Sequence, residues 1–332
     1  MPTQAEIVLD SISPAGDRLL SVAVELPRFI LAEVNTHRML SRSYGSSRAI
    51  PAEEMLRRVM EESFIPRYWG KNERGMQAKT PWGELVQYLG NGNEEEEYYS
   101  YEKKLGTPEE AWLASRDSAV LFASSFDTAG YHKQLVNRII EPYSYATGII
   151  TATEWDNFFT LRLHPDAQPE FQELAQAMKE AIDGSTPRRL EPGQWHLPFI
   201  RKEEQADFNK FAWITNKARN WSPIDTEKAV SAARCARISF ASNQRGKTFT
   251  IEQDLALYDR LFGPPFHAGP FEHQQTPMQY ANYNAQYLDL FQKEQVPTDG
   301  SILWEPGITH CDRKGNFWCA NSKGWIQQRH LL

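Results

Sequence analysis

Arginine and serine side chains gather between residues 38 and 48, where their types and spacing suit an anion. Arg38 and Arg42 are four residues apart, so on an α-helix their guanidinium groups would share a face and repel each other unless an anion lay between them. The residues that follow add hydroxyl groups, backbone N–H groups and a third guanidinium, a set that suits a phosphate: Ser46, Ser47 and Arg48. The alternative is a surface helix that carries its arginines incidentally.

Arg138 and Arg162 form a second pair of candidate anion-binding residues. We expect the apolar side chains just before Arg162, such as Phe158 and Leu161, to be buried, which would partly desolvate the guanidinium. A desolvated charge requires a partner. That partner is either a ligand or a nearby carboxylate, for which the sequence offers Glu154 and Asp166.

Histidine and cysteine give a weaker indication of a metal site. The segment His267–His273 contains two histidines and a carboxylate, but we favour a hydrogen-bonded loop. His310-Cys311, with Cys319 further on, lacks an evident fourth zinc ligand. None of the three cysteines forms a C-x-x-C pair, so we expect neither a metal nor a disulfide framework, and we infer a reducing, intracellular compartment.

The charge balance narrows the functional classes. The 332 residues contain 36 Lys and Arg against 43 Asp and Glu, a formal net charge of −7. A protein whose main work is to wrap duplex nucleic acid needs a surplus of basic side chains, so we exclude that class as a partner. The first residues do not resemble a signal peptide and no window has the length of a membrane span, so we expect a cytoplasmic protein without membrane contact.

Hydrophobic periodicity predicts the elements that must position these side chains. Residues 6–26 are typical of a β-hairpin, and Pro27 opens a predicted helix that carries residues 28–43. Residues 151–163 are amphipathic. Further helices are predicted at residues 52–62, 107–128, 131–140, 166–183, 207–220, 225–239 and 251–262.

Composition also suggests how the chain is divided. Residues 1–184 would form a core that carries the arginine-rich segment, with an insertion predicted at 66–108. Residues 185–206 begin with a run rich in Pro and Gly and are predicted to be a linker. Residues 207–332 would form a second half.

Taken together, these motifs resemble the flavin-dependent thymidylate synthases. The family signature is Arg-His-Arg-x-x-Ser-x-Asn-Glu-x-Ser-x-Arg-Tyr, and Thr36 to Ala49 keep its His, its second and last Arg and both Ser. The first Arg, the Asn, the Glu and the Tyr are replaced. Three further matches follow in family order, at residues 138–142, 157–162 and 167–170.

Two more family segments appear late in the chain. Residues 233–240 resemble an Ala-Ala-Arg-Val-Ser-Tyr segment, and His267–His273 resembles a His-x-x-Pro-Phe-Glu-His loop. Both precede the arginine signature in the family and follow it here. The resemblance therefore implies an α/β (α+β) fold, helix-rich with a small, mostly antiparallel sheet, that is permuted or partly duplicated.

The resemblance implies methylation of C5 of dUMP to give dTMP, with FAD as cofactor and methylenetetrahydrofolate and NADPH as co-substrates. It also implies a homo-oligomer, tetrameric in the family. Two close alternatives are hydroxymethylation of dUMP and action on UMP. A nucleotide-binding relative without catalysis stays open because four signature positions are replaced, and a zinc-dependent hydrolase built on the histidines is least favoured.

The resemblance further implies roles for individual residues. Arg162 would be the catalytic residue, because its guanidinium would contact the uracil edge and stabilise the N3-deprotonated pyrimidine. The substrate-binding residues would be Glu33, Ser46, Ser47, Arg48, Arg138 and Arg162. The cofactor-binding residues would be His37, Arg38, Arg42, Thr151, Asn157, Gly269, Glu272 and His273. No residue is expected to bind a metal.

Overall fold

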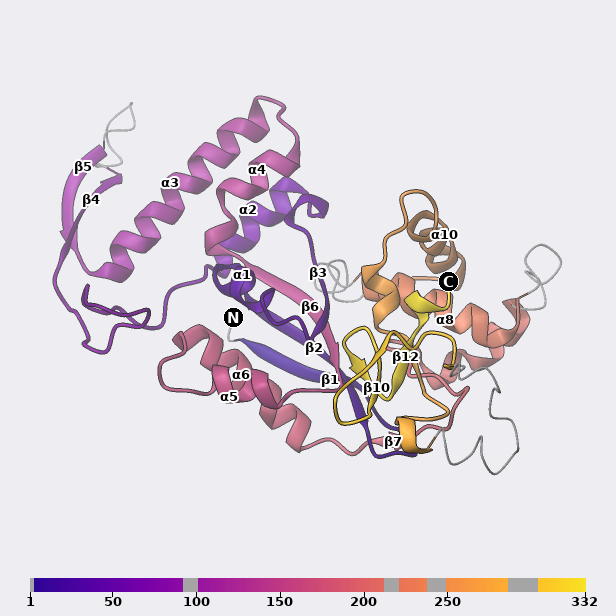
Figure 1. Cartoon of the computed structure of the whole chain (residues 1–332). Coiled ribbons are helices and arrows are strands. Elements are labelled where there is room, and N and C mark those ends of the chain that lie inside the picture. The colour runs from indigo at the N-terminus through magenta and orange to yellow at the C-terminus, as the bar shows by residue number, and fades with distance from the viewer. Residues whose placement is uncertain (1–2, 92–100, 212–220, 238–248, 286–303) are drawn as a thin grey trace, which may run out of the picture.

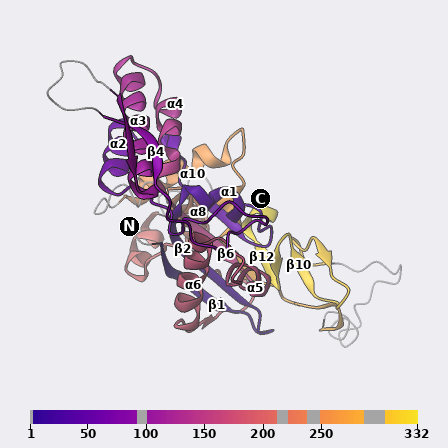
Figure 2. The same ribbon diagram turned by 90° about the vertical axis from the view of Figure 1, so that its left-hand side faces the viewer.

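The computed structural model describes residues 3–91, 101–211, 221–237, 249–285 and 304–332. Figures 1 and 2 show a central sheet, with helices α2–α4 toward one end of the molecule and the short strands β10 and β12 toward the other. No helix of the described ranges is both long and apolar enough to cross a membrane.

The central sheet has five strands in the order β3-β6-β2-β1-β7. β1 and β2 pair antiparallel from Gln4↔Glu25 to Ile12↔Arg18, which confirms the predicted hairpin. β6 pairs antiparallel with β2 and with β3, whereas β7 runs parallel to β1. The strands are β1 (Gln4–Ile12), β2 (Arg18–Pro27), β3 (Ser41–Tyr44), β6 (Tyr145–Ala152) and β7 (Arg188–Arg189). The α/β fold with a small, mostly antiparallel sheet is therefore present.

Alternation along β2 gives the sheet two chemically different faces. Leu20, Val22 and Val24 belong to the main hydrophobic core, together with residues of α5 (Asp156–Arg162) and α6 (Pro169–Asp183). Ser21 is also fully buried, but it lies on the opposite face, where its hydroxyl contacts Thr151 of β6. One face is thus apolar and covered by helices, and the other carries buried polar side chains.

The segment between β3 and β6 forms a helical lobe. α2 (Ala52–Glu61) and α4 (Lys133–Ile139) pack against α3 (Pro108–Thr128) in a separate apolar cluster. α3 begins as predicted, because the Thr107 hydroxyl accepts from the Glu110 backbone N–H and the Glu110 carboxylate accepts from that of Thr107. The hairpin of β4 (Val86–Asn91) and β5 (Tyr101–Gly106) lies within the predicted insertion 66–108.

The chain beyond β7 covers the polar face of the sheet. α8 (Pro223–Ala236) and α10 (Ile251–Phe262) pack around Phe208 and Phe271, and Trp325 packs on Leu19 of β2. The short strands of this part are β8 (Gln275–Pro277), β9 (His310–Cys311), β10 (Phe317–Cys319), β11 (Ser322–Lys323) and β12 (Trp325–Gln327). β8 pairs with β12, and β10 pairs with both β9 and β11.

The predicted helix over residues 28–43 is wrong. A 3₁₀ turn at Arg28–Ile30 leads into the four-residue helix α1 (Leu31–Val34), and residues 41–44 form β3 instead. Asn35 and Thr36 are weak helix formers, so a helix would gain little by continuing through them. Residues 41–44 gain the hydrogen bonds of a ladder with β6.

α8 ends at Ala236, and residues 238–239 of the predicted helix 225–239 lie outside the described ranges. The other helices agree with the sequence except in two further places. The amphipathic residues 151–163 divide between the end of β6 at Ala152 and α5 from Asp156. The predicted helix 207–220 is helical from residue 205 to residue 211, and its remainder lies outside the described ranges. The division into residues 1–184, 185–206 and 207–332 stays a prediction, although residues 188–189 of the predicted linker form strand β7.

Gly148 offers a test of the packing between β3 and β6. A Cβ atom at this position would lie 2.1 Å from Cδ1 of the Tyr44 ring, which packs across the glycine. We expect Gly148→Ala to lower the free energy of unfolding by roughly 1–3 kcal/mol, because the ring must shift in a packed core. Urea denaturation measures the change. Gly184→Ala is the matched control, since its Cβ would meet Glu180 O at 3.4 Å; equal losses in the two variants would contradict the assigned cause.

Candidate active site

Arg162, the last residue of α5, is held against His37. Its Nε–H donates a 2.8 Å hydrogen bond to Nε2 of His37, and its guanidinium carbon lies 4.2 Å from the centre of the Phe171 ring. The His37 ring packs edge-on against Phe158 and Phe171, with centroid distances of 5.1 and 5.8 Å. Aromatic side chains of the apolar core therefore pack against both His37 and Arg162.

The surroundings of His37 favour its neutral form. Burial and the guanidinium groups of Arg162 and Arg42 lower its pKa from 6.5 to about 4. Nε2 accepts the hydrogen bond from Arg162, so the neutral ring carries its proton on Nδ1. Nη1 and Nη2 of Arg162 make no hydrogen bond to the described residues, which leaves N–H donors for a ligand.

Neither carboxylate near Arg162 in the sequence is its partner. Glu154 pairs with Lys323 at 3.3 Å, and Asp166 lies 3.4 Å from Lys79. Burial lowers the pKa of Arg162, and the charge of the exposed Glu33 carboxylate opposes that shift. Glu33, His37 and Arg162, all assigned to the site by the resemblance, are thus brought together.

Arg42 has a different role from the one its spacing suggested. Because residues 41–44 form a strand, Arg38 and Arg42 do not share a helix face, and the predicted stripe of two guanidinium groups is wrong. Arg42 donates through Nη1 to the carbonyl of His37 and through Nη2 to that of Asn35, the latter at 3.1 Å. It holds the turn that carries His37, while the Arg38 side chain is exposed.

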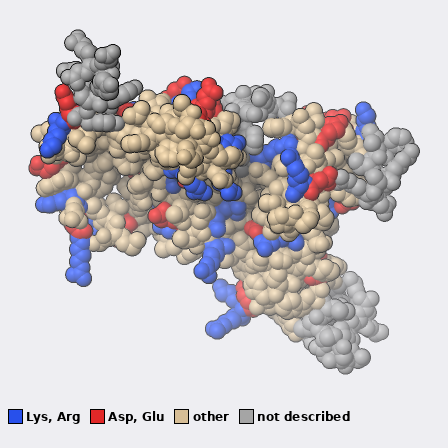
Figure 3. All heavy atoms as spheres, turned by 90° about the horizontal axis from the view of Figure 1, so that it is seen from above, with Lys and Arg blue, Asp and Glu red and all other residues tan. Residues whose placement is uncertain are grey.

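Two of the residues predicted to bind a phosphate, Ser47 and Arg138, contact the same carboxylate. The Ser47 hydroxyl donates to Oε1 of Glu141, and Nη1 of Arg138 lies 3.5 Å from Oε2 of the same carboxylate. Ser46 and Arg48 are exposed beside buried Ser47. Glu141 thus contacts a hydroxyl and a guanidinium that could also bind a phosphate. Figure 3 shows that Lys and Arg side chains gather near the middle of one face of the molecule.

Arg28 belongs to this region and was missed from the sequence. Its Nη2 donates a 2.7 Å hydrogen bond to the Gly45 carbonyl, and its buried Nε has no partner among the described residues. Burial lowers its pKa, with Glu141 opposing and Arg138 adding to that shift. The available signal was a cation at the start of a helical turn, where the helix dipole disfavours positive charge.

Two other predicted residues, His273 and Thr151, form a hydrogen-bonded group with Ser43, which lies on the face of β3 that is opposite to Arg42. Ser43 Oγ and His273 Nε2 share a 2.9 Å hydrogen bond, and His273 Nδ1 lies 2.8 Å from Thr151 Oγ1. His273 and Thr151 are 0% and 1% exposed, so both ring nitrogens and the threonine hydroxyl are engaged within the protein. In this structure these two residues are not free to hold a cofactor.

The same hydrogen-bonded chain continues across the sheet. Thr151 Oγ1 lies 2.6 Å from Ser21 Oγ, which lies 2.9 Å from His196 Nε2. His196 Nδ1 lies 2.9 Å from Ser11 Oγ. Hydroxyl groups on β1, β2, β3 and β6 are therefore hydrogen-bonded to two buried imidazoles from the C-terminal half of the chain, which is the part beyond β7.

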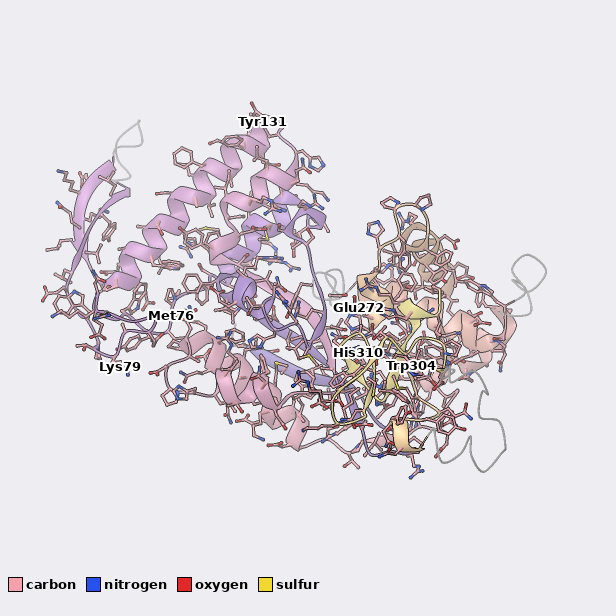
Figure 4. All side chains as sticks on the ribbon, viewed as in Figure 1. Met76, Lys79, Tyr131, Glu272, Trp304 and His310 are labelled. Carbon is pink, nitrogen blue, oxygen red and sulfur yellow. The ribbon has the colours of Figure 1, made fainter. Side chains whose placement is uncertain are left out.

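Three predicted cofactor-binding residues remain: Gly269, Glu272 and Asn157. Gly269 approaches Ser43, since a Cβ on the glycine would lie 3.9 Å from Oγ. Glu272 pairs with Arg329, and Figure 4 shows it in the C-terminal part on the side toward the sheet. Asn157 is exposed in the first turn of α5.

The described ranges contain no group of three His, Cys, Asp or Glu side chains placed to hold a metal ion. Cys311 and Cys319 lie on paired strands, and Cys319 is fully buried, where its sulfur accepts from the backbone N–H of Gln327.

Comparison with known proteins bears on the first half of the chain. The family described as thymidylate synthase complementing protein matches residues 13–188. Thymidylate synthase X (ThyX) from Helicobacter pylori, solved with FAD and dUMP, is 18% identical, with 49% of this chain and 67% of that chain covered and a TM-score of 0.34. The UMP/dUMP methylase PolB from Streptomyces cacaoi, bound with 5-Br UMP, is 14% identical, with coverages of 54% and 88% and a TM-score of 0.32. No curated protein matches.

The two buried histidines predict how stability depends on pH. Burial lowers the pKa of His196 and of His273 from 6.5 to about 3. Below about pH 6.5 the unfolded chain binds protons that the folded chain does not, so stability should fall between about pH 6.5 and about pH 3, by up to about 1.4 kcal/mol per pH unit for each histidine.

Chemical denaturation at several pH values measures this slope. His273→Gln should be less stable near neutral pH and show a shallower slope, because one buried imidazole is lost. His310→Gln, at an exposed histidine, is the control and should keep the wild-type slope. A wild-type slope in His273→Gln would show that this histidine is not protected from protonation.

Proposed function

The chain belongs to the thymidylate synthase complementing protein family, whose model matches residues 13–188, and we propose that it is a flavin-dependent enzyme that methylates C5 of dUMP to give dTMP. Methylenetetrahydrofolate and NADPH are the proposed co-substrates. The observation that carries the proposal is the half-buried Arg162, whose Nε is fixed by neutral His37 and whose Nη1 and Nη2 are without partners in the described ranges.

Arg162 can act on the pyrimidine without proton transfer. Its guanidinium is planar and stays charged at neutral pH, so two N–H groups can bind the edge of a uracil ring that has lost its N3 proton. The Phe171 ring and the surrounding core keep water from one side of the guanidinium, which strengthens its effect on a bound anion. Stabilising that anion raises electron density at C5 and makes C5 a better nucleophile.

The phosphate of dUMP has suitable donors nearby. Ser46 and Arg48 are exposed at the turn after β3, and Arg138 is 59% exposed and within 3.5 Å of Glu141. A phosphate that reached Arg138 would displace or share this carboxylate contact. Charge-assisted bonds from guanidinium groups to phosphate are among the stronger hydrogen bonds in proteins.

Only some of the residues predicted to bind FAD are free to contact it in this structure. Arg38 and Asn157 are exposed and make no side-chain hydrogen bond within the described ranges, so they can hold polar groups of the cofactor. His273 and Thr151 have no free polar atom, and Glu272 is already paired with Arg329. When bound, the reduced flavin would supply the hydride that completes the methyl group.

The cysteines support a reaction without an enzyme thiolate. Burial raises the pKa of Cys235, and it raises that of Cys319 to about 11. The pKa of Cys311 is also raised, by burial and by the charge of Asp312. A thiol nucleophile needs a lowered pKa near neutral pH, which none of the three has.

We also propose a cytoplasmic homo-oligomer, a tetramer as in the resembled family. Support comes from α3 and α4, which expose Phe122, Phe126 and Leu135 by 59, 36 and 47%. Tyr131, at the outer tip between these helices, is 56% exposed (Figure 4). Exposed apolar side chains in such a group are typical of a protein contact.

Product analysis tests the reaction itself. Purified enzyme, dUMP, methylenetetrahydrofolate and NADPH should yield a product with the mass of dTMP. Ser43 and Tyr44 replace the Asn and Glu of the signature, so the transferred group or the nucleotide could differ from that of the family. A hydroxymethyl product, or faster turnover of UMP than of dUMP, would support these alternatives. Binding of dUMP without NADPH oxidation would instead indicate a non-catalytic relative.

Arg162→Ala should reduce the rate of C5–H exchange in dUMP by roughly a hundredfold or more, because the pyrimidine anion loses its charge-stabilising donor. Exchange of deuterium at C5 measures the rate, and near-UV circular dichroism checks the fold. Arg57→Ala, on the exposed side of α2, is the control and should keep the wild-type rate. A wild-type rate in Arg162→Ala would mean that the catalytic residue is misassigned.

A further inference from the structure

A tight turn of the C-terminal sheet contacts the arginine signature. Ala320 and Asn321 connect β10 to β11, and the pairing Cys319↔Ser322 makes this a two-residue turn. Ala320 has φ +51°, a left-handed conformation that L side chains rarely adopt. Asn321 lies outside the family match at 13–188, but the turn places it beside residues that belong to the match.

The Asn321 amide joins the two parts of the chain. Its Nδ2 donates to the Arg38 carbonyl at 3.3 Å and to the Ser41 hydroxyl at 3.1 Å. Gln327 Nε2 donates to Asn321 Oδ1 at 2.7 Å, which determines that the other side of the amide, Nδ2, faces Arg38. Gln327 is fully buried, so it is a fixed support for this orientation.

The contacted turn carries the residues that matter most for the proposed reaction. Residues 35–40 link α1 to β3 and include His37, the partner of Arg162, and the exposed Arg38. Arg42 holds the carbonyls of Asn35 and His37. Asn321 holds the carbonyl of Arg38. The turn is therefore held both by Arg42, which lies within the family match at 13–188, and by Asn321, which lies outside it.

A second contact supports the same strand from the same half of the chain. His273 bonds to Ser43, two residues after Ser41 along β3. Side chains two apart on a strand share a face, so Ser41 and Ser43 both present their hydroxyls to the C-terminal half. The C-terminal half therefore contacts β3 through two separate polar side chains.

We propose that Asn321 is a positioning residue for the turn of residues 35–40 and that the C-terminal half is thereby part of the nucleotide site. It acts through the backbone of Arg38 and through Ser41, and it fixes the position of His37 and hence of Arg162. The inference about nucleotide binding rests on the proposed function; the positioning of the turn rests on the contacts alone.

The test uses the full-length chain with three variants. Asn321→Ala removes all of the amide contacts. Asn321→Asp keeps an acceptor for Gln327 and for the Ser41 hydroxyl but lacks the donor to the Arg38 carbonyl. Lys323→Ala is the matched control, because Lys323 lies on β11 and joins the same halves through Asp17 and Glu154 without contact to the signature.

Hydrogen exchange of the backbone amides of residues 36–40 gives a readout that needs no ligand. Asn321→Ala and Asn321→Asp should both speed this exchange about tenfold, and Lys323→Ala should leave it at the wild-type rate. Unchanged exchange in Asn321→Ala, or equal acceleration in Lys323→Ala, overturns the positioning role. Rescue by Asn321→Asp overturns the assigned donor to Arg38.

Calorimetric titration with dUMP tests the link to binding. Asn321→Ala should weaken dUMP binding about tenfold, whereas Lys323→Ala should bind as the wild type does. Faster exchange with unchanged dUMP affinity overturns the inclusion of the C-terminal half in the nucleotide site. If the wild type itself fails to bind dUMP, the proposed function fails, and the exchange measurement still decides the positioning role.

Discussion

A guanidinium held where water is partly excluded is the interaction on which the rest of the site depends. Burial of Arg162 costs free energy, and the compensation comes from the face of Phe171, from the lone pair of neutral His37 and from the charge of Glu33. None of these partners is an ion-paired carboxylate that would occupy the terminal nitrogens. The arrangement therefore keeps a fixed charge available for a planar anion, and α5, α6 and the turn of residues 35–40 all serve to hold it.

The polar face of the sheet imposes the second constraint. Hydroxyl groups buried on β1, β2, β3 and β6 must be hydrogen-bonded, and the chain meets this need with two imidazoles from its C-terminal half. The solution ties the C-terminal half to the strand that carries Ser41 and Ser43. It also engages the polar atoms of His273 and Thr151, whereas Arg38 and Asn157 stay exposed. Along β3, Ser41 and Ser43 thus bond to the chain beyond β7, whereas Arg42 holds the turn of residues 35–40.

The sequence predicted elements with local signals and missed those that depend on distant partners. Thr107 and Glu110 form a capping box within four residues, and α6 shows its apolar period throughout, so both helices were placed correctly. Strand β3 was not predicted because its partner β6 lies about a hundred residues further along the chain. Periodicity placed Arg42 on a helix, and Arg28 offered only one weak signal, a cation at the start of a helical turn. The pairing of Arg162 with His37 was not predicted, because neither residue marks the other in sequence and the resemblance assigned one to the substrate and the other to the cofactor. Leu161, which was expected to be buried, is 49% exposed.

The central claim is that this site binds a flavin and a pyrimidine nucleotide together. Titration of the purified full-length protein with FAD, followed by absorbance in the flavin bands before and after addition of dUMP, tests it most directly. The account predicts saturable uptake of FAD and a change in the flavin spectrum when dUMP is added. A colourless protein that takes up no FAD under these conditions would contradict it.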